Sequence, residues 1–240
     1  MQFEKFRKFF IDTISWLLFT NRCRYCNKII GKDETLCDDC KEHLPTISGE
    51  KCKYCGAEKS RCNCKKRKKS FEAVTAPFYY ENSIKKSIHL LKFSEKDFLA
   101  YQLAQDMADC VRTDFENIDF DFICFVPFSA TQRIKRIYNQ SELLAINLSK
   151  KLNLPLKNAL VKIFDTNAQH NMNYKEREGN VFGIYDVAND VDVSGKTILL
   201  VDDVKTSGAT LNECAWILRI RGAEKVYCVV SAIAGAKTKE

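Results

Sequence analysis

The sequence predicts an α/β protein in which a parallel sheet flanked by helices is preceded by a small cysteine-rich zinc-ribbon module. Two observations lead to this prediction. Eight of the 12 cysteines lie in close pairs between positions 23 and 64, and after residue 71 short apolar runs alternate with amphipathic segments. Charge divides the chain in the same way, because residues 1–70 carry 17 Lys and Arg against 9 Asp and Glu in a chain of net charge +7. We therefore expect three parts, residues 1–22, 23–70 and 71–240.

Composition excludes several classes of protein. The chain of 240 residues is 45% hydrophobic and 29% charged, as in an ordinary globular protein and unlike a disordered one. No apolar run approaches the ~18 residues of a membrane-spanning helix. The N-terminal stretch contains Asp12 and lacks a signal-peptide cleavage site. We therefore expect a cytoplasmic protein, with contact at the inner face of the membrane left open.

Residues 1–22 are expected to form an amphipathic helix, because large apolar side chains recur at spacings of three and four. Glu4, Lys5, Lys8 and Asp12 lie between them. Such a helix either packs on the rest of the protein, which is the more common case, or lies on a membrane surface as a peripheral contact. The apolar positions are Phe3, Phe6, Phe10, Ile14, Leu17 and Leu18.

The cysteine pairs of residues 23–70 have the spacing of zinc ligands. Two C-x2-C pairs are followed by C-x2-C-G and then by a C-x-C pair. Each pair places two thiolates on one turn, and two turns complete a tetrahedral Zn²⁺ site, so we expect one or two structural zinc ions. Gly56 leaves the backbone free to turn under the metal. The expected ligands are Cys23, Cys26, Cys37, Cys40, Cys52, Cys55, Cys62 and Cys64.

Alternatives to this arrangement are a disulfide framework and a different pairing of the ligands. Disulfides require an oxidising compartment, for which the sequence carries no signal. In the simplest pairing, the first four cysteines bind one ion and the last four bind another. An interleaved cross-brace is the alternative that stays open. The other cysteines lie among apolar residues and are expected in the core: Cys110, Cys124, Cys214 and Cys228.

Five consecutive cations follow the cysteine pairs: Lys65, Lys66, Arg67, Lys68 and Lys69. They are too many to bury, so they form either a solvated linker or a surface that contacts phosphates. Small zinc modules often carry basic surfaces that bind nucleic acid. We therefore treat this basic stretch as the candidate nucleic-acid contact.

Residues 71–240 alternate between helices and strands. Helical segments are expected at 83–93, 96–111, 141–152 and 211–221, the last ending at Gly222. Apolar runs at 120–126, 197–201 and 226–233 are expected as strands, and the continuous run at 197–201 is typical of a parallel strand buried on both faces. Strands separated by helices in this order give a parallel sheet with helices on both faces.

The junction at 198–210 carries the strongest functional signal. An apolar strand leads into Asp202 and Asp203, and a short loop of small residues and a helix follow. Backbone N–H groups of such a loop can hold a phosphate at the helix N-terminus, and Gly208 lets the backbone approach the ligand closely. The two carboxylates can accept hydrogen bonds from a ribose and order a Mg²⁺-bound ligand. The pattern fits a phosphorylated sugar, and neither a Walker loop nor a dinucleotide-binding glycine motif is present.

Residues 198–210 resemble the phosphoribosyl diphosphate (PRPP) motif of type I phosphoribosyltransferases. With the cysteine pairs upstream, nearly the whole chain is similar to the ComF family (ComFC type) of bacterial competence proteins, which join a zinc ribbon to a phosphoribosyltransferase-like domain. The V-P-F of 126–128, the R-I-Y-N-Q of 136–140 and the L-K-F of 91–93 are similar to elements of that family. The resemblance implies a type I phosphoribosyltransferase-like sheet in residues 71–240.

The resemblance also implies the ligand and its contacts. PRPP with Mg²⁺ is the expected ligand, with Asp202 and Asp203 facing the ribose. The loop would hold the 5-phosphate through Lys205, Thr206, Ser207, Gly208, Ala209 and Thr210. The pyrophosphate side would be formed by Pro127, Phe128, Ser129, Arg133 and Arg136. The polar segment 165–177 would be a lid over the ligand, with candidate residues Gln169 and Arg177.

Three functions are consistent with these features. The family's association with natural transformation implies a DNA-uptake protein that binds PRPP, contacts single-stranded DNA and meets other competence proteins. The alternative is an active phosphoribosyltransferase acting on a base or an amine, unrelated to DNA uptake, for which the sequence identifies neither acceptor nor catalytic residue. The third is a sensor in which bound PRPP alters the affinity for DNA or a partner.

Overall fold

The computed structural model describes residues 21–62, 64, 69–93, 97–128, 138–163 and 184–234. Residues 1–20 of the expected N-terminal helix and the lid expected at 165–177 lie outside the described residues, and Asn21 and Arg22 are not helical. None of the described helices has the length and apolar character that crossing a membrane requires.

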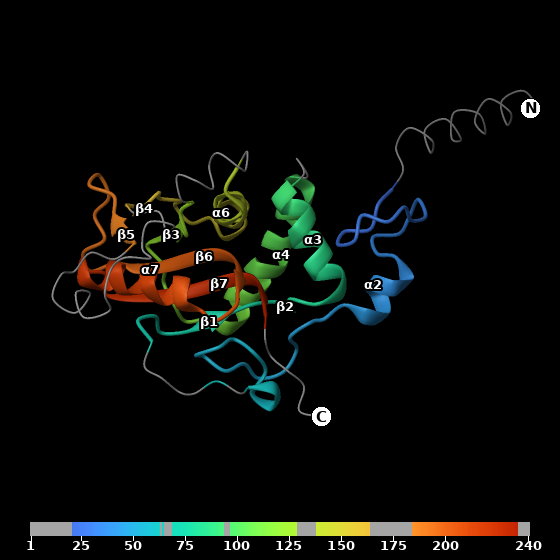
Figure 1. The fold of residues 1–240 in the computed structure, drawn as a ribbon, viewed down its shortest axis with the longest axis horizontal. Coiled ribbons are helices and arrows are strands. Elements are labelled where there is room, and N and C mark those ends of the chain that lie inside the picture. Colours follow the sequence, from blue (N-terminus) through green and yellow to red (C-terminus); the bar gives the residue numbers. More distant parts are fainter. Residues whose placement is uncertain are drawn as a thin grey trace, which may run out of the picture.

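A parallel sheet forms the centre of the fold (Figure 1). Within the described residues it has five strands in the order β1-β7-β6-β3, with β2 also paired to β7, and every pairing is parallel. A separate antiparallel pair is formed by β4 (Leu160–Lys162) and β5 (Tyr185–Val187). The parallel sheet predicted from the sequence is confirmed. Its strands are β1 (Val74–Thr75), β2 (Phe78–Tyr79), β3 (Phe122–Phe125), β6 (Thr197–Lys205) and β7 (Lys225–Ile233).

Helices cover both faces of this sheet. Successive residues of a strand point to opposite sides, so β6 contributes to two cores. Leu199 and Val201 share one core with α3, α4 and α6, whereas Ile198 and Leu200 share the other core with α7. The helices are α3 (Asn82–Phe93), α4 (Asp97–Asp114), α6 (Gln140–Leu152) and α7 (Ala209–Ile220). Each lies within three residues of its predicted bounds.

The cysteine-rich part, with α2 (Asp38–His43) and the short 3-10 helix η1 (Lys59–Arg61), packs on the sheet domain in two places. Tyr25 lies in the core of α3 and α4, and its ring meets that of Phe78 edge to face at 5.4 Å. Ile47 and Ala57 lie in the opposite core, beside α7. In Figure 1 the first of these segments lies next to α3 and the second lies below β1. The two halves of the module therefore contact different faces of the sheet.

Strand β6 is longer than its apolar run predicts. The expected strand stops at Val201, but pairing with β7 continues, with Asp202 opposite Val230 and Lys205 opposite Ile233. The hydrogen bonds of a parallel ladder are made by the backbone, so polar side chains do not end the strand while a partner continues beside it. Both carboxylates consequently belong to the strand and not to the loop.

Candidate functional site

Asp202 and Asp203 lie at the carboxyl end of β6, the edge where parallel sheets bind ligands. Both residues are partly exposed, whereas Val201 before them is buried. Oδ1 of Asp202 accepts hydrogen bonds from Oγ of Ser141 at 2.7 Å and from the Asp203 N–H at 2.9 Å. Oδ1 of Asp203 accepts one from the Val204 N–H at 2.7 Å. One oxygen of each carboxylate is fixed in this way.

The start of α6 places Ser141 against Asp202. Asn139 caps the helix: its side-chain oxygen accepts from the Ser141 N–H at 3.1 Å, and its amide donates to the Val126 carbonyl at 2.9 Å. The Val126 N–H in turn donates to the Val201 carbonyl at 3.0 Å. The first turn of α6 therefore contacts a carboxylate of β6. Ser141 and Asn139 were not among the site residues predicted from the sequence, and the helix cap that follows the V-P segment is the signal that indicates them.

A tight loop joins β6 to α7. Gly208 is the N-cap of α7 and has a φ of 78°, in the left-handed region. The backbone angle favours glycine, and a Cβ at this position would lie 3.0 Å from Cε of Lys205. Ser207 and Thr210 are exposed, and Oγ of Ser207 accepts from the Ala209 N–H at 3.3 Å. The loop presents hydroxyl groups and a helix N-terminus to solvent, which is an arrangement that fits a phosphate.

The residues predicted for ribose and phosphate thus lie together, from the end of β6 to the first turn of α7. The side chain of Lys205 is buried beneath the loop, so what it offers a ligand is its backbone. Pro127 and Phe128 follow β3, the neighbour of β6, after Val126 and lie at the same edge. The other candidates lie outside the described residues: Ser129, Arg133, Arg136, Gln169 and Arg177.

The cysteines form two groups of four that follow the order of the sequence. The first cysteine group is Cys23, Cys26, Cys37 and Cys40, and the second cysteine group is Cys52, Cys55, Cys62 and Cys64. Within each group all Sγ atoms lie within 4.8 Å of one another. A tetrahedral site with Zn–S bonds of about 2.3 Å needs S–S distances of about 3.8 Å. Both groups fit a zinc ion, and the grouping is the sequential one, not the interleaved cross-brace.

Each cysteine group contains one thiol that ionises easily. Burial raises the pKa of Cys23, but hydrogen bonds from the backbone of Cys26 and Cys37 outweigh it and bring the pKa to about 7. Burial acts in the same way on Cys52, whose pKa is brought to about 7 mainly by the backbone of Cys55. Such N–H···S bonds stabilise the thiolate, which is the form that binds metal.

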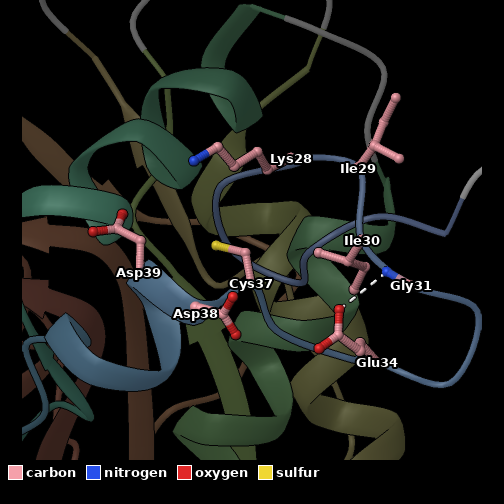
Figure 2. A pocket seen from close by; sticks show the side chains of 8 residues that line it. All are labelled: Lys28, Ile29, Ile30, Gly31, Glu34, Cys37, Asp38 and Asp39. Carbon is pink, nitrogen blue, oxygen red and sulfur yellow. Dashed lines mark hydrogen bonds between the residues drawn. The ribbon is translucent and has the colours of Figure 1, made fainter.

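A cavity of about 440 Å³ opens on the first cysteine group (Figure 2). Three carboxylates line it, and Glu34 accepts a hydrogen bond from the Gly31 N–H at 3.0 Å. Lys28 is the one cation among the described lining residues, and Lys41 pairs with Glu34 at 2.8 Å and with Asp38 at 3.1 Å. The lining consists of Lys28, Ile29, Ile30, Gly31, Glu34, Cys37, Asp38 and Asp39.

The end of the basic stretch lies next to the loop at Gly208. The Ser70 N–H donates to Oδ1 of Asn212 at 2.9 Å, and the Asn212 N–H donates to the Gly208 carbonyl at 3.0 Å. Lys69, just before Ser70, is close enough for its charge to act on Lys205. The remaining basic residues lie outside the described part of the chain: Lys65, Lys66, Arg67 and Lys68.

Comparison with known proteins gives matches to both parts of the chain. Residues 14–70 match the double zinc ribbon domain, and residues 137–240 match the phosphoribosyl transferase domain. Competence protein F of Haemophilus influenzae is 29% identical over 221 residues, which cover 87% of this chain and 95% of that protein. DNA utilization protein YhgH of Escherichia coli (strain K12) is 27% identical over 219 residues, which cover 86% of this chain and 88% of that protein.

A solved structure of the allosteric regulatory enzyme of purine biosynthesis aligns with 60% of this chain and 29% of its own, at 20% identity and a TM-score of 0.43. The two domain matches coincide with features of the structure, because the first contains both cysteine groups and the second contains the loop at Gly208. The resemblance to the ComF family is confirmed: the chain is a homologue of competence protein F in which a double zinc ribbon domain precedes a phosphoribosyl transferase domain.

Proposed function

We propose that this protein binds PRPP with Mg²⁺ at the carboxyl end of β6 and acts in the handling of incoming DNA. The observation that carries the proposal is the junction between β6 and α7, where two oriented carboxylates precede a left-handed glycine and a helix N-terminus. The helix N-terminus suits the 5-phosphate, and Asp202 and Asp203 suit the ribose hydroxyl groups. The names of its relatives, a competence protein and a DNA utilization protein, support a role in DNA uptake.

A calorimetric titration tests the ligand. PRPP and Mg²⁺ are titrated into the zinc-loaded protein and into the variant Asp202→Asn/Asp203→Asn. The matched control is Asp190→Asn/Asp192→Asn, which removes the same charge from exposed residues before the opposite end of β6. We expect binding by the wild type and the control and loss of binding in the Asp202 variant. Equal affinity of all three proteins for PRPP would show that PRPP does not bind at Asp202 and Asp203, which would contradict the proposal.

We propose, in addition, that residues 1–22, 23–70 and 71–240 are separate units and that both cysteine groups hold structural zinc. When bound, each ion ties two turns together and supplies folding free energy to a segment with a small core of its own. The backbone N–H groups that lower the pKa of Cys23 and Cys52 support this assignment, because they prepare one thiolate in each group.

Single-stranded DNA is the proposed partner of the basic stretch. Lys69 is half-buried and precedes Ser70, which contacts Asn212 of α7, so this end of the basic stretch lies near the proposed ligand site. Phosphate contacts release counter-ions, so affinity should fall with salt. Replacing Lys68 and Lys69 by Gln should weaken binding of a labelled single strand and flatten its salt dependence. The exposed pair Lys85 and Lys86 of α3 is the matched control, and an equal loss there would contradict the proposal.

Transfer of the phosphoribosyl group to a base or an amine is the second candidate function, since a donor site of this kind serves an enzyme equally well. In that reaction the nucleophile forms a bond to C1 of the ribose and pyrophosphate leaves. Release of pyrophosphate on addition of an acceptor would establish it. Binding without release, together with DNA affinity that changes on addition of PRPP, would favour the sensor, for which the Ser70–Asn212 contact offers a direct link.

A further inference from the structure

Lys205 is the only charged side chain that is almost fully buried among the described residues, with an exposed fraction of 6%. Its ammonium makes no hydrogen bond or ion pair with a described residue, and burial lowers its pKa. A buried cation is costly unless negative charge lies near it. Negative charge near Lys205 would therefore stabilise its ionised form.

The stem of Lys205 supports the loop from below. Its Cε lies 3.0 Å from the point where a Cβ of Gly208 would be, so the backbone of Gly208 rests on the lysine side chain. Gly208 is the N-cap of α7 and sets the direction of the first turn. A displacement of the Lys205 side chain would therefore change the packing beneath Gly208.

The second cysteine group contacts β7, the strand that pairs with β6 at Lys205. Lys205 is paired in register with Ile233 of β7. Gly56, which directly follows Cys55, packs so tightly on Ile233 that a Cβ on this glycine would lie 2.6 Å from its Cδ1. The Gly56 N–H also donates to the Cys52 carbonyl at 2.7 Å, so this turn of the zinc module is fixed against the end of β7.

Cysteines of this group raise the pKa of Lys205, whereas burial and the charge of Lys69 lower it. They are Cys55, Cys64 and Cys52. Four thiolates and one Zn²⁺ carry a net charge of −2, so a loaded site remains anionic. The buried ammonium and the anionic site compensate each other, because opposite charges in a poorly solvated region attract strongly.

We propose that Lys205 is the counter-ion of the zinc site in the second cysteine group and that, through Gly208, it makes the order of the Lys205–Thr210 loop depend on that zinc. The first cysteine group has no such connection, because its residues pack in the core of α3 and α4 on the other face of the sheet. The inference rests on the proposed function only in the identity of the ligand that the loop serves. Its zinc part and its loop part can both be measured without PRPP.

Zinc retention tests the counter-ion. The wild type, Lys205→Met, Lys205→Arg and Lys225→Met are loaded with zinc and exposed to a coloured chelator. Lys225 is the control, because it is exposed at the opposite end of β7. Loss of an outer partner weakens metal sites by about 10-fold or more. We expect one of the two ions to leave Lys205→Met about 10-fold faster, and Lys205→Arg and Lys225→Met to retain both. Equal release from Lys205→Met and the wild type would overturn the proposal.

Amide exchange tests the coupling to the loop. Cys62→Ser/Cys64→Ser empties the second cysteine group, and Cys23→Ser/Cys40→Ser empties the first and serves as the control. We expect faster exchange of the amides of residues 206–210 in the first variant only. Equal exchange of these amides in both variants would overturn the coupling. Failure of the wild type to bind PRPP would leave both measurements intact, so it would count against the proposed function and not against this inference.

Discussion

Ser141 donates its hydroxyl to Oδ1 of Asp202 at 2.7 Å, so the first turn of α6 holds a carboxylate that belongs to β6. This hydrogen bond links the start of α6, which follows β3 in the chain, to the end of β6. It therefore connects two of the segments that surround the proposed ligand site. Asp202 thereby keeps one orientation before a ligand arrives, which reduces the ordering that binding requires.

Replacement of Ser141 by Ala should weaken PRPP binding by about 10-fold, because a hydrogen bond to a charged group is worth about 1.5 kcal/mol or more. The matched control is Ser149→Ala in the last turn of the same helix, where the hydroxyl donates to the Leu154 carbonyl at 2.6 Å. Calorimetry and urea unfolding measure affinity and stability. Equal losses of affinity in both variants would mean that Ser141 acts only through the stability of α6.

Gly208→Ala should destabilise the protein more than Gly195→Ala. Both glycines have positive φ, 78° and 68°, so alanine costs about 1 kcal/mol or more at each from backbone strain alone. A Cβ at Gly208 would press on Cε of Lys205, whereas nothing lies within 4 Å of one at Gly195. Urea unfolding of the two variants isolates the contact with Lys205. Equal free energies of unfolding would show that the lysine stem yields without cost.

Acidity should stabilise the contact between the zinc module and α4. Tyr25 donates to Oδ2 of Asp106 at 3.0 Å, and burial raises the pKa of Asp106 from 3.8 to about 6 although this hydrogen bond lowers it. The folded state therefore binds the proton more tightly than the unfolded state. The contribution of Asp106 to stability is present below pH 4 and is lost as pH rises through about 6.

Asp106→Asn is the variant that measures this contribution. Because acid also releases zinc from thiolates, the free energies of unfolding of the two proteins are compared at each pH. The stability of the variant relative to the wild type should increase between pH 4 and 6 and stay constant above. A constant difference across this range would contradict the pKa of Asp106.

Zinc counting separates the two pairings of the cysteines. Cys23 and Cys40 belong to one group in the structure, so their double replacement by Ser should leave one zinc ion per chain. In an interleaved cross-brace the same two residues serve different ions, and none would remain. Cys110→Ser, outside both groups, should retain two ions and is the control.

The sequence predicted the features that depend on local spacing. The close spacing within each cysteine pair places two thiolates on one turn, which predicts zinc ligands. Gly208 after a buried strand indicates a tight turn into a helix. It did not predict that β6 continues to Lys205, because that depends on its partner β7. Nor did it predict the Ser141–Asp202 bond or the burial of Lys205, since both arise where segments distant in sequence meet. Helix caps and strand partners are tertiary information that a single sequence carries weakly.

The central claim is that the loop between β6 and α7 holds the phosphate of PRPP, and hydrogen exchange with and without PRPP and Mg²⁺ tests it most directly. The amides from Thr206 to Leu211 face the proposed phosphate or lie in the first turn of α7, so they should exchange more slowly when the ligand is bound. The account predicts protection concentrated in these residues and absent in Asp202→Asn/Asp203→Asn. Binding that protects other segments and leaves residues 206–211 unchanged would contradict it.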